Sequence, residues 1–152
     1  MRGVMIGCAL LATLALAAGC AANGAAAGAA SSGGAMTLEG TTWSLVEIGG
    51  QLARPAGTSG TPTLRLDAAQ KRASGDTGCN SFGGGYELSG ESLQFGALAS
   101  TRRACVDGDL NAQEAAYLRA LADTRTWQIA DDTLVLRGVT RPVARFAVQG
   151  AR

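Results

Sequence analysis

From Thr37 to Val148, apolar residues occur mostly in short runs that alternate with polar residues and are separated by turn-forming residues. Alternation with a period of two places successive side chains on opposite faces of a strand. The pattern therefore predicts a domain of antiparallel β-strands. The predicted strands are residues 42–48, 63–66, 93–95, 126–129, 133–136 and 143–148.

One segment, residues 111–123, has the periodicity of a helix instead. Asn111 and Glu114 have the spacing of a capping box, in which each side chain bonds the free backbone N–H of the other, so we expect the helix to begin at Asn111. Tyr117, Leu118 and Leu121 then lie on one face. We expect Tyr117 to pack in the core with its hydroxyl at the rim.

The N-terminus has the organisation of a targeting signal. Residues 4–18 form fifteen uncharged, mostly apolar positions that follow Arg2 and end in small residues before Cys20. These are the n-region, h-region and cleavage site of a signal peptide, which we assign to residues 1–19. A retained transmembrane helix is the weaker alternative, because a bilayer requires roughly 20 apolar residues.

Cys20 follows small residues, as in the lipobox of bacterial lipoproteins, which this segment resembles, although Ala17 stands where that motif usually has Leu. The resemblance implies that the Cys20 thiol takes a diacylglycerol, becomes the new N-terminus and holds the protein on a membrane. We assign residues 20–36 to the acylated cysteine and a flexible Ala/Gly/Ser tether. Residues 37–149 remain for the folded domain.

Charge and composition argue against several functional classes. Thirteen Lys+Arg balance twelve Asp+Glu, and Lys71 is the single lysine, so there is no basic field to bind nucleic acid. Histidine is absent, which removes Ser-His-Asp and Cys-His catalysis and histidine-ligated metals. We therefore expect no catalytic residues, no metal, no cofactor and no nucleic-acid partner.

The four cysteines predict one disulfide. Cys8 leaves with the signal peptide and Cys20 is acylated, so Cys79 and Cys105 are the thiols left in an exported domain. Such a pair usually forms a disulfide in an oxidising compartment. A redox-active pair is the weaker alternative, because the chain has no Cys-x-x-Cys motif.

Two further motifs favour structural roles. Glycines 83–85 lack the Gly-Lys-Ser/Thr ending of a phosphate-binding loop and favour a loop with positive φ angles before a strand at Tyr86. Asp107, Asp109 and Asn111 have the first spacings of a calcium loop, but its later glycine and glutamate are missing. Carboxylates at the positive end of a helix explain these acids better.

A series of short motifs runs through the predicted domain. After a Gly-x-x-Trp-x-Leu segment at residues 40–45 come Gly78-Cys79-Asn80, Gly85-Tyr86, Thr101 with Ala104-Cys105, and Glu114. Together they resemble the META domain, the family of HslJ-like, heat-shock-associated bacterial envelope proteins. The resemblance implies an α+β fold with a curved antiparallel sheet, partly barrel-like, and one packed helix. No catalytic residues are recognised in this family.

The resemblance also implies a role. Members are linked to heat shock and to tolerance of antibiotics such as novobiocin, so we expect a non-enzymatic, membrane-tethered envelope lipoprotein with a structural or binding function. Two alternatives stay open: a pilotin-like carrier of lipid or another apolar ligand, and an inhibitor of a hydrolase. The partner would be an envelope protein or an apolar ligand. Because Ala21 is not the Asp of an inner-membrane retention signal, we expect the outer membrane, facing the periplasm, in a bacterium with two membranes.

Overall fold

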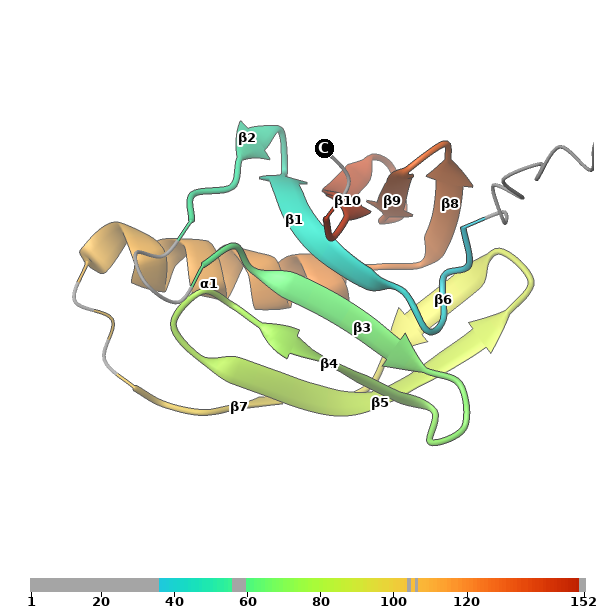
Figure 1. Cartoon of the computed structure of the whole chain (residues 1–152), viewed down its shortest axis with the longest axis horizontal. Helices are drawn as coiled ribbons and strands as arrows, with labels where there is room; N and C mark the ends of the chain where they lie inside the picture. The colour runs from blue at the N-terminus through green and yellow to red at the C-terminus, as the bar shows by residue number, and fades with distance from the viewer. Residues whose placement is uncertain (1–35, 56–59, 104, 106, 151–152) are drawn as a thin grey trace, which may run out of the picture. The chain divides into compact units, whose positions relative to one another are not determined.

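The computed structural model describes residues 36–55, 60–103, 105 and 107–150, which form strands and one helix (Figure 1). The strands are β1 (Thr42–Ile48), β2 (Gln51–Leu52), β3 (Thr63–Asp67), β4 (Arg72–Asp76), β5 (Ser81–Ser89), β6 (Ser92–Phe95), β7 (Ala99–Ser100), β8 (Thr126–Ala130), β9 (Thr133–Arg137) and β10 (Pro142–Val148). The helix is α1 (Gly108–Ala122). It is too short and too polar to cross a membrane. The signal peptide and Cys20 lie outside the described residues.

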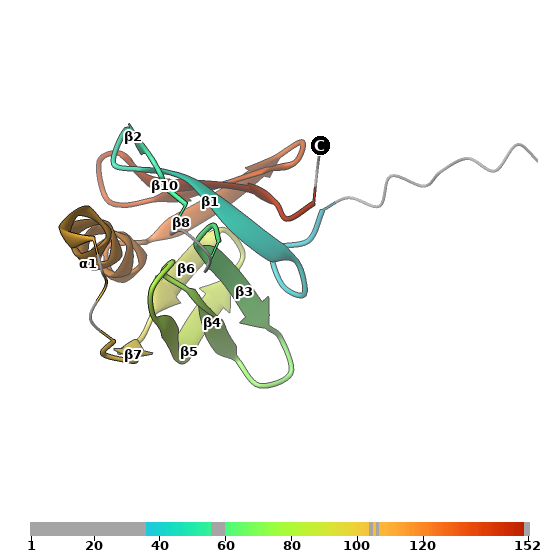
Figure 2. The ribbon, with the colours of Figure 1, turned by 60° about the vertical axis from the view of Figure 1, so that its left-hand side comes forward.

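The strand pairings are antiparallel and connect in a ring. The order is β1, β3, β4, β5, β6, β8, β9 and β10, and β10 pairs again with β1. The ring is incomplete at one place, which we call the seam, because β6 and β8 share a single residue pair, Ser92 with Thr126. Figure 2 shows the strands curving around the interior with α1 at one side. The predicted α+β class, a curved antiparallel sheet with one helix, is confirmed.

Alternate side chains of these strands, together with buried side chains of α1, fill the interior of the ring. The most deeply buried are Trp43, Leu64, Leu66, Leu93, Tyr117, Leu121, Leu134, Leu136 and Phe146. Among the described residues, the buried core runs from Leu38 to Phe146. Residues 36–150 therefore carry a hydrophobic core of their own and have the features of an independently folding domain.

Helix α1 begins earlier than the sequence predicted. Its first residue is Gly108, and the N-cap is Asp107, whose side-chain oxygen accepts the backbone N–H of Asp109 at 2.9 Å. The predicted capping box of Asn111 and Glu114 is therefore wrong. Asp107, four residues before Asn111, caps the helix by accepting the N–H of Asp109, and Glu114 is left to make other contacts.

Tyr117 connects α1 to the ring interior. Its ring meets Phe82 edge-on with centroids 5.6 Å apart and lies 6.0 Å from the ring of Phe146. Its hydroxyl donates to the carbonyl oxygen of Thr63 in β3 at 3.0 Å. Tyr117 is 0% exposed, so the expectation of a hydroxyl at the rim is wrong: a strand carbonyl accepts it inside the domain.

Glycines 83–85 lie within β5 and not in a loop, so that prediction is wrong. None of the three has a positive φ angle; in this region that conformation belongs to Gly78, at 98°. Gly84 is needed for space, because a Cβ there would lie 2.5 Å from the carbonyl oxygen of Ala97. The missing side chains let residues 96–98 pass against the sheet, and they also hide the alternation that marks a strand.

Candidate functional site

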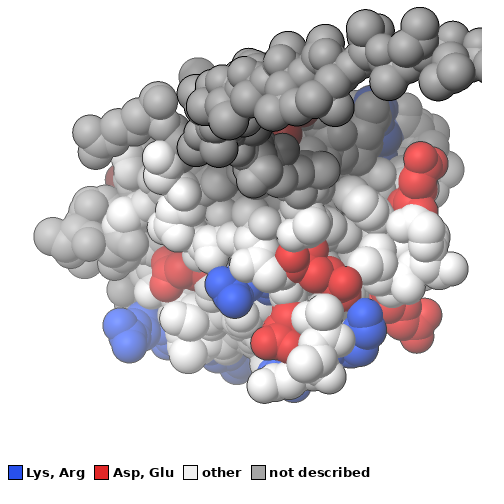
Figure 3. Space-filling model, turned by 45° about the vertical axis from the view of Figure 1, so that its right-hand side comes forward, with Lys and Arg blue, Asp and Glu red and all other residues white. Residues whose placement is uncertain are grey.

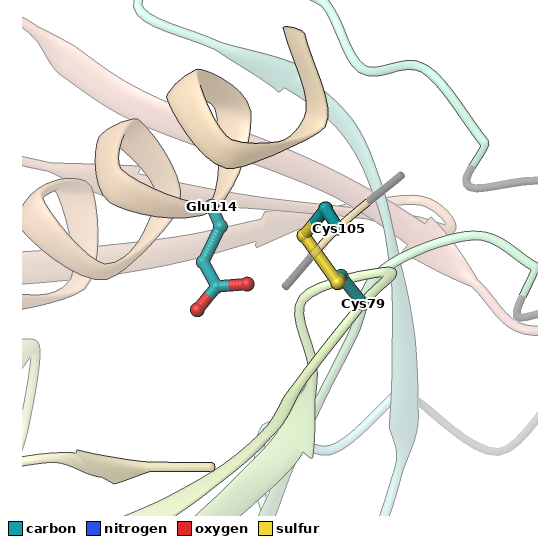
Figure 4. Close-up of side chains that lie close together, drawn as sticks. All are labelled: Cys79, Cys105 and Glu114. Carbon is teal, nitrogen blue, oxygen red and sulfur yellow. A yellow bond between two sulfur atoms is a disulfide. The ribbon is translucent and has the colours of Figure 1, made fainter. Parts of the chain in front are cut away.

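The two cysteine motifs meet beside the start of α1. Cys79 lies in the turn between β4 and β5, and Cys105 lies in the segment that leads into the helix. The structure joins them by a disulfide with their Cα atoms 5.8 Å apart. Glu114 projects from α1 toward this pair (Figure 4). The disulfide therefore fastens the β4–β5 turn to the approach of the helix.

Asn80 is the centre of the hydrogen bonds beside the disulfide, and it is 4% exposed. Its side-chain oxygen accepts the hydroxyl of Thr101 at 2.9 Å and the backbone N–H of Arg103 at 2.7 Å. Its side-chain nitrogen donates to Glu114 at 2.8 Å and to the carbonyl of Arg103 at 3.2 Å. Both ends of the amide are thus fully used in joining three segments of the chain.

Glu114 brings α1 into the same network. One carboxylate oxygen accepts from Asn80 and from the hydroxyl of Thr77, the latter at 2.9 Å. The other lies 3.4 Å from the hydroxyl of Ser100. We call Thr77, Asn80, Ser100, Thr101 and Glu114 the motif cluster. Sequence reasoning missed Thr77 and Ser100, although each immediately precedes a motif residue.

The disulfide and Glu114 also have the spacing of a metal site. The two sulfur atoms and a carboxylate oxygen of Glu114 lie within 4.8 Å of one another. Metals bind thiolates, however, and here each sulfur is used in the bond to the other. The Glu114 carboxylate is also engaged by Asn80 and Thr77. The arrangement therefore acts as a structural clamp in its oxidised form.

The remaining residues of the family motif lie on β5 or beside it. Gly78 has a φ angle of 98° and donates its N–H to the carboxylate of Asp76 at 2.6 Å. Gly85 and Tyr86 are neighbours in β5. Ala104 lies outside the described residues. The structure thus brings Gly78, Asn80, Thr101 and Glu114 together and places Tyr86 in a different cluster.

Tyr86 joins the N-terminal segment to the β3–β4 hairpin. Its hydroxyl donates to the carboxylate of Glu39, and the carbonyl of Asp67 lies 3.1 Å away. The ammonium of Lys71 lies 2.9 Å from Glu39 and 5.6 Å from the centre of the Tyr86 ring. The hydrogen bond from Tyr86, and then that from Lys71, lowers the pKa of Glu39. Burial, and then the Glu39 carboxylate, raises the pKa of Tyr86.

Several hollows lie on the surface of the domain, and two of them have volumes of about 470 and 480 Å³. The first lies between the β1–β2 hairpin and α1, has a volume of about 470 Å³, and includes the exposed Leu52. Its polar walls already bind each other: the Arg54 guanidinium lies 2.7 Å from Asp109, and the Arg54 backbone exchanges two hydrogen bonds with the side chain of Gln113.

The second, which we call the seam hollow, lies beside β8 and has a volume of about 480 Å³. It is lined by Met36, Glu91, Trp127, Gln128, Ile129 and Asp131. Figure 3 shows acidic and basic side chains interspersed with uncharged ones over one face of the molecule. Sequence reasoning placed Trp127 and Ile129 on a strand but could not show that one edge of this strand is largely unpaired by the other residues that the structure describes.

The fold and its motif cluster define a class of protein. The family model described as META domain matches residues 36–150, so the chain belongs to the META domain family. The resemblance found in the sequence is thereby confirmed. The META domain is not a known enzyme family.

Solved structures share the fold. An NMR structure of a protein from Burkholderia xenovorans is 30% identical with a TM-score of 0.57, and the match covers 75% of this chain and 85% of that one. Another NMR structure is 21% identical with a TM-score of 0.58 and coverage of 72% and 91%. A crystal structure of a DUF4847 family protein from Bacteroides vulgatus is 14% identical with a TM-score of 0.51 and coverage of 72% and 93%. No curated protein matches the chain.

Proposed function

We propose that this chain is a non-enzymatic lipoprotein of the cell envelope, in which an acylated Cys20 tethers a META domain that binds a partner at its surface. The observation that carries this proposal is the internal use of the motif residues. The disulfide and the motif cluster bind the β4–β5 turn, residues 101–103 and α1 to one another. Their role is to hold a rigid domain together.

The chemistry of the polar groups supports a non-enzymatic role. The pKa of Glu39 is lowered, and the pKa values of Tyr86 and Tyr117 are raised. Each of these shifts moves the group away from neutral pH, whereas a general acid or base works best with a pKa near the working pH. The absence of histidine from the sequence points the same way.

The filled interior favours binding at the surface over the carrier alternative. A carrier needs space inside the ring, but Trp43, Tyr117 and Phe146 occupy it and are each 0% exposed. Small rings of strands are usually filled in this way by their own side chains. A ligand inside would have to displace the Tyr117 contacts that hold α1.

The sequence supports the membrane tether. A signal-like segment leads to Cys20, and the Ala/Gly/Ser-rich residues after it would give the domain reach from the membrane surface. A disulfide in the domain agrees with export to an oxidising compartment. Ala21 favours the outer membrane, and the family link to heat shock favours a role under envelope stress.

The tether is tested by replacing Cys20 in a cell that processes lipoproteins. The wild-type protein should fractionate with membranes, and mass spectrometry should find its N-terminal cysteine acylated. Cys20→Ser should remove the acyl groups and leave the protein unprocessed or released. Cys8→Ser, in the predicted signal peptide, is the matched control and should stay acylated.

Membrane-bound, acylated Cys20→Ser protein would refute the lipoprotein assignment.

Sorting is tested separately on a density gradient that resolves two membranes. The wild type should band with the outer membrane and Ala21→Asp with the inner membrane. If the wild type bands with the inner membrane, the proposed location is wrong.

A further inference from the structure

Strand β8 has an edge that no other described residue pairs along most of its length. On one side it pairs with β9 at each of its residues, Thr126–Ala130. On the other side it meets β6 only through the pair of Ser92 and Thr126. The backbone N–H of Trp127 donates to the carbonyl of Glu91 at 3.1 Å, and this is the last backbone–backbone bond across the seam within the described part of the chain.

The alternation of a strand identifies the free groups. The N–H of Trp127 points across the seam, and successive residues point their N–H and C=O groups to opposite edges. The C=O of Trp127 and the N–H and C=O of Ile129 therefore face the seam, while Gln128 and Ala130 bind β9. A row of free backbone groups is the template to which an extended chain pairs.

The seam hollow supplies apolar surface next to these groups. Trp127 and Ile129 are half-buried, and Met36 is 39% exposed, so their free faces can cover apolar side chains. The indole N–H of Trp127 donates to the carbonyl of Gly90 at 3.0 Å, which holds the ring against the β5–β6 turn. The hollow is thus built on a fixed aromatic side chain, of the kind that anchors binding sites.

The charged side chains that line the seam hollow favour a positively charged partner. Its charged lining residues are Glu91 and Asp131, both acidic. Neither takes part in the ion pairs found among the described residues, which are Arg54–Asp109, Lys71–Glu39 and Arg145–Glu47. A ligand with Lys or Arg would complement these carboxylates.

We propose that the seam edge of β8 binds an extended, basic segment of a partner polypeptide, which adds to the sheet as a further strand. Apolar side chains of the segment lie over Trp127 and Ile129, and its Lys or Arg residues lie near Glu91 and Asp131. A lipid offers no row of amides to the free groups of β8, so the edge selects a peptide. This proposal rests on the binding function proposed above and names its class of partner.

The test uses residues 21–152, which contain the complete core, and a fluorescent, end-capped peptide Lys-Val-Thr-Val-Thr-Val-Lys. Fluorescence anisotropy should show saturable binding, and replacing both lysines by glutamate should weaken it about tenfold or more. Two further peptides carry N-methyl groups on the three valines or on the two threonines. An added strand turns alternate amides toward β8, so one of these peptides should bind and the other should not.

Variants of β8 complete the test. Ile129→Pro removes an N–H that faces the seam and leaves the bonds to β9, so it should weaken binding about tenfold. Ile129→Val keeps the N–H and should bind like the wild type. Asp131→Asn should weaken binding of the lysine peptide, whereas Asp132→Asn, the next residue of the same turn and not part of the hollow, should not. The peptide comparison stands even if Ile129→Pro fails to fold.

The proposal is overturned if the lysine peptide does not bind, if both N-methylated peptides bind equally, or if well-folded Ile129→Pro binds like the wild type. The proposal is also overturned if the peptide binds a fragment of residues 36–152 but does not bind residues 21–152. Residues 21–35 of the chain itself would then be the occupant of the edge. None of these results bears on the acylation of Cys20. The membrane tether and the partner class can therefore fail separately.

Discussion

At the scale of single residues, the Tyr86–Glu39 contact makes stability depend on pH. Because the pKa of Glu39 is lowered in the fold, its contribution is present above the ordinary glutamate pKa of about 4.3 and is lost as the pH falls through its folded value. Tyr86→Phe removes the main cause of that shift. Urea unfolding measured from about pH 3 to about pH 7 checks this. As the pH falls, the free energy of unfolding should decrease less in Tyr86→Phe than in the wild type.

Tyr117→Phe is the matched control for this prediction. The pKa values of Tyr86 and Tyr117 are both raised, so each stabilises the fold below about pH 10 and loses that contribution as the unfolded chain ionises above it. Both variants should therefore lose less stability at alkaline pH. Only Tyr86→Phe should change the acid side, and an unchanged acid slope in that variant would contradict the assigned cause.

The sequence identified several residues of the motif cluster, but it did not predict which hydrogen bonds they make. The resemblance picked out Asn80, Thr101 and Glu114, and the structure places all three in one cluster. The sequence did not show that these three side chains are joined by hydrogen bonds, because Glu114 also has the spacing of a capping box with Asn111. Which N-cap forms depends on the path of the chain before the helix, where Asp107 takes the role. Tertiary contact decided between two locally plausible bonds.

At the scale of elements, β5 depends on a close approach that glycine permits. A Cβ on Gly84 would lie 2.5 Å from the carbonyl oxygen of Ala97 and 2.8 Å from the side chain of Leu98. On Gly83 it would meet a flexible Arg72 nitrogen at 3.4 Å. Gly84→Ala should therefore lower the free energy of unfolding by about 2–3 kcal/mol, through overpacking against backbone.

Gly83→Ala is the control for this prediction. It lies one position away on the same strand and should change the free energy of unfolding by less than about 1 kcal/mol, because the Arg72 side chain can move aside. Urea denaturation of the two variants measures the difference. Equal stability would show that residues 96–98 do not pass β5 as closely as the structure indicates.

The same close approach explains which elements the sequence revealed. Strands with large alternating side chains, such as β1, β3 and β9, were predicted within a residue of their observed bounds. β4 was missed, and of β5 only the part from Tyr86 onward was expected, since the periodic signal depends on side chains and both strands are rich in Gly, Ser and Ala. Sequence pattern detects a strand by the regular spacing of large apolar side chains, and glycines 83–85 interrupt that spacing between Phe82 and Tyr86.

At the scale of the whole domain, the extent of strand pairing differs around the ring. β1, β9 and β10 pair along most of their lengths, and the aromatic core joins them to α1. The seam rests on one residue pair. A closed ring would have no free strand edge, whereas in this ring part of β8, beside an aromatic side chain, is paired by no other described residue. Sequence reasoning predicted the curved sheet but could not show where the ring fails to close, since that depends on pairing between distant strands.

The disulfide is the covalent link across this domain, and its contribution is the last prediction. It joins the β4–β5 turn to the segment before α1, at a sequence separation of 26 residues. Replacing Cys79 and Cys105 by serine should lower the free energy of unfolding by roughly 2–4 kcal/mol, much of it through a less constrained unfolded chain. The melting temperature should fall by about 10–20 °C. Because the motif cluster keeps its hydrogen bonds, circular dichroism should still show the strands and the helix.

Wild-type protein melted in reductant should match the double variant, and a double variant as stable as the oxidised wild type would show that the motif cluster alone holds these segments together.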